Sequence, residues 1–256
     1  LRLVGSEMCI RDRCYNIVYT GGSAVPGMST PVHQLSPQQK LFSQNGGITI
    51  MNVLLINGSP HAHGCTDAAL QEIAKALNAD GIETTIYHIG AVPVGGCVGC
   101  GGCSKAGKCV FGGPVADVLP LVEKADGIVF GAPVHYATAA ASMLGFMHRL
   151  AISGGKYLRH KPAAVVTSAR RAGTTTALEA MEKVPQFFEM PLISSTYWPM
   201  VHGGKAEEVL SDEEGLQIMR NLGRNMAWML RCIEAGKAAG IAAPVAENDK
   251  RTNFIR

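Results

Sequence analysis

The chain has 256 residues, of which 47% are hydrophobic and 17% charged, and its formal net charge is +3. This composition supplies ample apolar material for a buried core. The positive charge is mild and comes without a dense block of lysine or arginine, so the sequence indicates neither nucleic acid nor an anionic membrane as a partner. No apolar run is long enough to span a bilayer, and we see no secretory signal.

The first fifty residues differ in pattern from the rest of the chain. Residues 1–50 carry scattered Gly, Pro, Ser and Gln without helical or strand periodicity, so we expect them to be disordered or an artefact of gene assembly. Met51 then opens a sharply patterned segment. We expect translation to start there and residues 51–256 to form the functional domain.

From Met51 onward, short apolar runs alternate with amphipathic segments. Val53–Asn57 is a continuous apolar run of the kind found in a central parallel strand. Ser211 and Glu214 form a capping box that predicts the start of the last helix. The expected strands are 53–57, 83–89, 127–131, 163–167 and 192–197, and the expected helices are 66–79, 115–125, 137–150, 174–188 and 211–235.

This alternation predicts an α/β fold. We expect a doubly wound, five-stranded parallel sheet in the order 2-1-3-4-5, with helices on both faces. Ligands of such sheets bind beyond the carboxyl ends of the strands. The loops that follow the first, third and fourth strands are therefore the candidate binding loops.

The first candidate loop suits a phosphate group. Ser59 and Thr66 place hydroxyls on either side of a turn that feeds a helix N-terminus, where free backbone N–H groups bind anions. The loop lacks the Gly-Lys-Ser/Thr ending of a nucleoside triphosphate site, which favours a single phosphate monoester. The alternative is a plain turn with an N-cap.

The other two loops carry aromatic and basic side chains. His135 and Tyr136 follow the third strand, where they would either contact a flat heteroaromatic ring or close the edge of the core. Arg170 and Arg171 follow the fourth strand, where they would meet a phosphate or the electron-rich edge of a ring, or form a solvated face.

A cysteine loop at residues 97–109 reads CVGCGGCSKAGKC. Cys97, Cys100, Cys103 and Cys109 are soft ligands with the concentration and spacing of a metal or iron–sulfur site. Three interpretations remain open at this point, namely an iron–sulfur cluster, a structural zinc ion and free thiols without metal. Eight cysteines, four of them clustered, fit a reducing cytoplasm better than a disulfide framework.

Taken together, these motifs resemble the flavodoxin-like NADPH-dependent FMN reductases, and specifically their iron–sulfur flavoprotein branch. The resemblance covers residues 51–256 and rests on GSPHAHGCT, CVGCGGCSKAGKC, GAPVHYATAAASMLGFMHR and SARRAGTT, in this order. It implies FMN and a [4Fe–4S] cluster as cofactors. It implies that the FMN phosphate is held by Ser59, His61, Gly64, Cys65 and Thr66. It implies that the flavin ring is lined by Pro133, Val134, His135 and Tyr136, and that its other side is closed by Ser168, Arg170, Arg171 and Gly173. It implies that the cluster is ligated by Cys97, Cys100, Cys103 and Cys109.

The resemblance also implies a function. We expect an FMN-dependent oxidoreductase that takes electrons from NAD(P)H or a ferredoxin-like donor and passes them to a quinone, free flavin, an oxygen species or another protein. The flavin carries the chemistry, so no side chain is expected to be catalytic. We further expect a cytoplasmic homo-oligomer. The alternatives are an electron carrier without its own NAD(P)H oxidation, a flavin reductase without a cluster, and a non-redox zinc-binding scaffold.

Overall fold

The computed structural model describes residues 50–250 and 252. The predictions for residues 1–49 and for the last residues lie outside this part of the chain. Five parallel strands form a sheet in the order β2-β1-β3-β5-β6, and a short sixth strand, β4, pairs antiparallel with β3. The doubly wound order 2-1-3-4-5 is therefore confirmed, with β5 and β6 as the fourth and fifth parallel strands.

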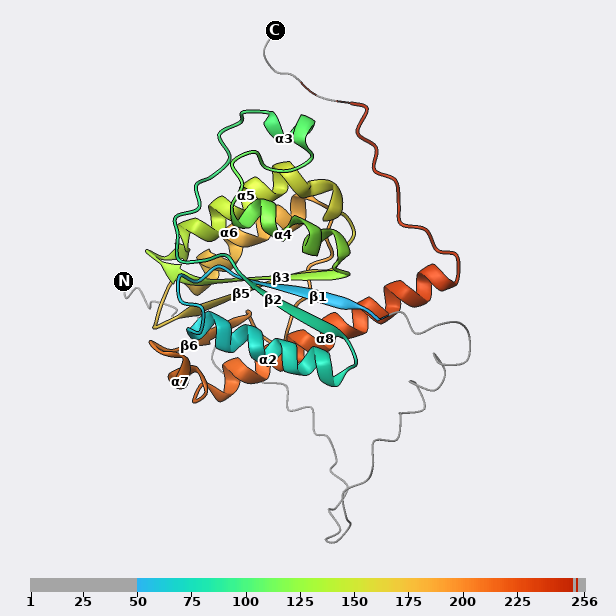
Figure 1. Cartoon of the computed structure of the whole chain (residues 1–256). Coiled ribbons are helices and arrows are strands. Elements are labelled where there is room, and N and C mark those ends of the chain that lie inside the picture. The colour runs from blue at the N-terminus through green and yellow to red at the C-terminus, as the bar shows by residue number, and fades with distance from the viewer. Residues whose placement is uncertain (1–49, 251, 253–256) are drawn as a thin grey trace, which may run out of the picture. The chain divides into compact units, whose positions relative to one another are not determined.

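The strands and helices alternate as the pattern predicts (Figure 1). The strands are β1 (Asn52–Asn57), β2 (Glu83–His88), β3 (Gly127–His135), β4 (Thr138–Ala139), β5 (Ala163–Ala169) and β6 (Met200–His202). The helices are α2 (Cys65–Ala79), α3 (Gly102–Ala106), α4 (Pro114–Lys124), α5 (Ala141–Gly154), the 3₁₀ turn η1 (Gly155–Tyr157), α6 (Thr174–Phe187), α7 (Ala206–Val209) and α8 (Glu213–Ala238). None of these helices is both long and apolar enough to cross a bilayer.

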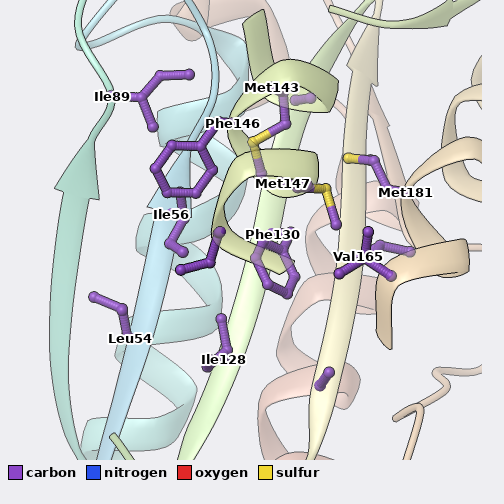
Figure 2. Close-up of a cluster of buried hydrophobic side chains, with 14 of the residues drawn as sticks. Leu54, Ile56, Ile89, Ile128, Phe130, Met143, Phe146, Met147, Val165 and Met181 are labelled. Carbon is purple, nitrogen blue, oxygen red and sulfur yellow. The ribbon is translucent and has the colours of Figure 1, made fainter. Parts of the chain in front are cut away.

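Helices cover both faces of the sheet (Figure 1). On one face, α4, α5 and α6 bury their apolar sides, and Figure 2 shows Phe146 and Met147 of α5 against Ile56 and Phe130 of the strands. On the other face, α2 and α8 form a second apolar layer. Because β1 and β3 are buried from both sides, their sequences are continuous apolar runs rather than alternating ones.

The predicted fifth strand at residues 192–197 is wrong. Leu192 makes only an isolated bridge to Ala163, and regular pairing with β5 resumes at Met200. The segment between them turns toward α8, where the Ser195 hydroxyl donates to the Ile218 carbonyl oxygen at 2.7 Å. Contacts with a helix far along the chain therefore replace the sheet pairing.

Two helix starts also differ from the prediction. Helix α5 begins at Ala141 rather than at 137, because β3 continues to His135 and turns back into β4 through Tyr136 and Ala137, both with left-handed φ angles (49° and 60°). The predicted capping box of α8 is wrong as well. The N-cap is Asp212, whose carboxylate accepts from the Gly215 amide at 2.9 Å.

An ion pair joins α2 to α8 and makes stability depend on pH. Glu72 Oε1 lies 2.6 Å from Arg220 Nη1, and Lys75 also reaches the carboxylate. Burial alone would raise the pKa of Glu72, but the hydrogen bonds and charges of Arg220 and Lys75 lower it below its ordinary value. Since the folded-state pKa is depressed, the pair stabilises the fold at neutral pH and this contribution is lost as pH falls through that pKa.

We therefore expect Glu72→Gln to reduce the free energy of unfolding at pH 7 by about 1 kcal/mol, a modest amount because Arg220 is 39% exposed and solvent screens the pair. Urea unfolding of the variant and the parent should converge at an acid pH below the depressed pKa of Glu72, where its carboxylate is protonated in the folded state as well. Glu83→Gln, at an exposed position, is the matched control. An equal loss at both pH values would contradict this explanation.

Candidate functional site

The three predicted binding loops meet at the carboxyl edge of the sheet. The Thr66 and Ser168 hydroxyls, which are 102 residues apart and both buried, lie 2.8 Å from each other and join the first turn of α2 to the end of β5. Gly173 packs against the loop after β3, since a Cβ at Gly173 would lie 2.7 Å from the Ala137 Cα. The topology thus brings together the residues that the sequence motifs singled out.

A buried asparagine fixes the first loop. Asn57 is fully buried at the end of β1, where its Oδ1 accepts from the Ser59 amide at 3.0 Å and its Nδ2 donates to the Ala62 carbonyl at 3.2 Å. The Ser59 hydroxyl in turn accepts from the His61 amide at 3.1 Å. These bonds hold the loop from Ser59 to Ala62 in a single turn ahead of α2.

The start of α2 is suited to a phosphate. Gly64 is the N-cap and supplies no side-chain acceptor. The amides of Cys65, Thr66 and Asp67 have no hydrogen-bond acceptor among the described residues, so they remain available to an anion at the positive end of the helix dipole. The Asp67 carboxylate, which lies in the same turn, is 3.4 Å from His63 Nδ1. Backbone amides and buried hydroxyls together fit one phosphate monoester.

Cys65 belongs to this turn, but its side chain points elsewhere. Its Sγ donates to the Gly203 carbonyl oxygen at 3.3 Å. Burial raises the pKa of the Cys65 thiol, a backbone hydrogen bond opposes this, and the nearby charges of Glu208 and Glu207 raise it further. Cys65 therefore offers a bound phosphate its backbone amide rather than a thiolate.

The loops after β3 and β5 differ strongly in exposure. Tyr136 is fully exposed at the tip of the β3–β4 hairpin, and His135 beside it is exposed as well, whereas Pro133 and Val134 are half-buried. Across from them, Ser168 is buried, and Arg170 and Arg171 are exposed and form no ion pair with any described residue. A planar ligand between these loops would meet half-buried apolar groups on one side and exposed positive charge on the other.

Two contributors to this edge were missed by the sequence analysis. Asn57 does carry a readable signal, because it is a polar residue that closes an apolar run. The His88 Nε2 at the end of β2 lies 2.7 Å from the Ser59 carbonyl oxygen and supports the loop from outside. No local pattern points to His88, because this contact spans 29 residues.

The cysteine loop forms a second site, beyond α5 on the side away from the sheet (Figure 1). A pocket of ≈ 190 Å³ opens there and is lined by residues of the loop and of α5. Gly99, Gly101 and Gly107 have left-handed φ angles near 70°, which lets the chain wrap tightly around it. The lining includes all four predicted ligands, Cys97, Cys100, Cys103 and Cys109, together with Val98, Val110, Phe111, Arg149, Ile152 and Ser153.

The donor set of this pocket fits an iron–sulfur cluster. Its four thiols are soft ligands, and no carboxylate or imidazole lines the pocket with them. Within residues 50–250 and 252, no three Cys, His, Asp or Glu side chains gather closely enough to hold a single metal ion. Four thiols around one pocket supply one thiolate for each iron of a [4Fe–4S] cluster, so the residues present fit that group.

Helix α5 connects the two sites. It begins at Ala141, directly after the β3–β4 hairpin, and its residues from Arg149 to Ser153 line the cysteine pocket. At 1.5 Å per residue, Ala141 and Ile152 are about 16 Å apart along the helix axis. One rigid element thus spans the distance between the candidate flavin loops and the candidate cluster.

In sequence, the chain is similar to known flavoproteins. A family model described as NADPH-dependent FMN reductase matches residues 51–205. An iron–sulfur flavoprotein of Methanocaldococcus jannaschii is 29% identical over 192 residues, which cover 72% of this chain and 100% of the relative. An iron–sulfur flavoprotein of Archaeoglobus fulgidus is 33% identical over 126 residues, which cover 48% of this chain and 62% of the relative.

Solved structures support the fold. A WrbA-like flavodoxin from Agrobacterium tumefaciens superposes with a TM-score of 0.53 at 16% identity, over 71% of this chain and 98% of the other. A flavone reductase superposes with a TM-score of 0.54 at 17% identity, over 72% of this chain and 64% of the other. With a matching family model over more than half of its length, the chain belongs to the NADPH-dependent FMN reductase family, and iron–sulfur flavoproteins are among its relatives, as its motifs predict.

Proposed function

We propose that this member of an FMN-dependent oxidoreductase family moves electrons between NAD(P)H or a ferredoxin-like donor and a quinone, flavin, oxygen species or protein acceptor, through a [4Fe–4S] cluster. One observation carries the proposal. Four cysteines line a single pocket at one end of α5, and the candidate flavin loops lie at the other end of the same helix.

The chain's own residues would bind and orient the cofactors. The amides of Cys65, Thr66 and Asp67 and the hydroxyl of Ser59 would hold the FMN phosphate. Val134 and the loop around Gly173 would position the ring. When bound, FMN accepts a hydride as an electron pair and releases electrons singly, which is the chemistry the side chains cannot supply.

Exposure at the two sites supports open access for donors and acceptors. Arg170 and Arg171 place two positive charges beside the ring loops, which favours an anionic donor such as NAD(P)H. Cys97 and Cys100 are exposed, so a cluster there would lie close to solvent and to a protein acceptor. Exposed thiols of this kind persist in a reducing compartment, in keeping with a cytoplasmic location.

Self-association is part of the proposal, but the apolar side of α8 does not carry it. Met219, Leu222 and Met226 on that side are buried against α2 and the sheet within one chain. Trp228, on the same helix, is 63% exposed and remains available to a second copy. Light scattering on the purified protein would give the subunit number, and a monomer would remove this part of the proposal.

The proposal is tested by the spectrum and composition of the full chain purified without oxygen. We expect flavin bands on a broad absorbance from iron and sulfide, with about four of each and one FMN per chain. Flavin without iron would leave a flavin reductase lacking a cluster. A steady-state NAD(P)H assay with small acceptors then separates an enzyme from an electron carrier, because a carrier shows negligible turnover.

A further inference from the structure

Arg149 of α5 contacts the last cysteine of the loop, 40 residues away in sequence. Its Nε and Nη2 donate to the Cys109 Sγ at 3.3 Å and 3.2 Å. The same Nη2 donates to the Gly112 carbonyl oxygen at 2.7 Å. One guanidinium therefore holds both Cys109 and the turn that follows it.

Among the described residues, no carboxylate lines the cysteine pocket beside Arg149. Arg149 forms no ion pair with any residue in the described part of the chain, and the pocket that it lines contains no acidic side chain. A guanidinium only donates hydrogen bonds, and hydrogen bonds from a cation are strongest to an anionic acceptor. Its partner is thus best matched when the sulfur of Cys109 is a thiolate, which is the form that ligates a metal.

The backbone beneath Arg149 is held firmly. Met147, on the opposite side of α5, and Leu150 are buried in the core over the sheet. On the loop side, Gly145 packs so closely on the backbone of residues 94 and 95 that any Cβ there would collide with it. The guanidinium is therefore presented to the cysteine loop from a fixed helix rather than from a flexible surface.

We propose that Arg149 is a positioning residue of the cysteine pocket, which holds Cys109 as the fourth cluster ligand and places a fixed positive charge beside the cluster. This inference rests on the cluster of the proposed function. A fixed positive charge stabilises the reduced cluster, which carries one more electron, relative to the oxidised one. Arg149 would thereby raise the reduction potential of the cluster.

The test compares three variants of the full chain, prepared without oxygen. Arg149→Gln removes the charge and the paired donors, whereas Arg149→Lys keeps the charge but loses the fork geometry. Lys124→Gln removes a positive charge from the exposed end of α4, about 15 Å along that helix from Pro114, and is the matched control. The readouts are iron and sulfide per chain and the reduction potential, followed by electron paramagnetic resonance.

We expect the one-electron reduction constant of the Arg149→Gln cluster to fall about tenfold, which is a shift of about 59 mV to more negative potential. Arg149→Lys should stay near the parent potential while it retains less iron, because it cannot hold Cys109 and Gly112 together. Lys124→Gln should match the parent in both readouts. FMN content and circular dichroism show whether each variant is folded.

The outcomes separate this inference from the proposed function. A parent chain without iron and sulfide overturns the cluster and this inference with it. A parent with a cluster, and an Arg149→Gln variant equal to it in potential, overturns the inference alone. Lower iron and sulfide in both Arg149→Gln and Arg149→Lys than in Lys124→Gln supports the positioning role, whereas equal losses from Arg149→Gln and Lys124→Gln overturn it.

Discussion

Replacing Asn57 with alanine is expected to weaken FMN binding about tenfold to a hundredfold and to reduce the free energy of unfolding by about 1–3 kcal/mol. Asn57 is fully buried and bonds both ends of the first loop, the Ser59 amide and the Ala62 carbonyl. Alanine would leave the buried Ser59 amide without a partner and free the loop that precedes the α2 amides. The measurement is FMN titration of the apoprotein together with urea unfolding.

The same strand offers the control. Asn52, at the other end of β1, makes only a long side-chain bond of 3.4 Å to the Thr85 hydroxyl, far from the loop. Asn52→Ala should leave the affinity for FMN unchanged. Asn57→Asp keeps the acceptor for Ser59 but loses the donor to Ala62 and adds a negative charge near the phosphate, so it should bind FMN no better than Asn57→Ala. If Asn57→Ala bound FMN as tightly as Asn52→Ala, the phosphate would not lie in this loop.

The centre of the sheet could be predicted from the sequence because its signals are local. Strands buried on both faces must be continuously apolar, and Val53–Ile56 meets this condition. The edge of the sheet could not be predicted in the same way. Leu192 and Ile193 are as apolar as a strand, but the following residues bond to α8 instead, and this outcome depends on a helix that the chain forms later.

The candidate site likewise has parts that local sequence signals predict and parts that depend on distant contacts. The binding loops followed from topology, since parallel strands place their carboxyl ends at one edge, and the cysteine loop followed from spacing. The left-handed turn at Tyr136 and Ala137 carried no signal, because neither residue is a glycine. The role of Arg149 could not be predicted either, since its hydrogen bonds to Cys109 exist only once α5 has packed on the sheet.

Replacing Cys100 with alanine is expected to remove most of the iron and sulfide from the protein and to leave its FMN in place. A cube of four irons takes one thiolate on each, so the loss of one ligand leaves one iron without a protein ligand. Cys100 is exposed and makes no hydrogen bond with its side chain among the described residues, so the fold should tolerate the change. Iron, sulfide and FMN are counted per chain after anaerobic purification.

Cys232→Ala is the matched control, because Cys232 is also exposed and free but lies on α8, outside the cysteine pocket. Equal iron in the two variants would show that the metal is bound elsewhere.

Cys100→Ala and Asn57→Ala together test whether the two sites are independent, since the flavin loops and the cysteine pocket are built from different segments and share only α5. Asn57→Ala should lose FMN and keep iron, while Cys100→Ala should lose iron and keep FMN. Loss of both cofactors from either variant would mean that the two sites do not fold independently.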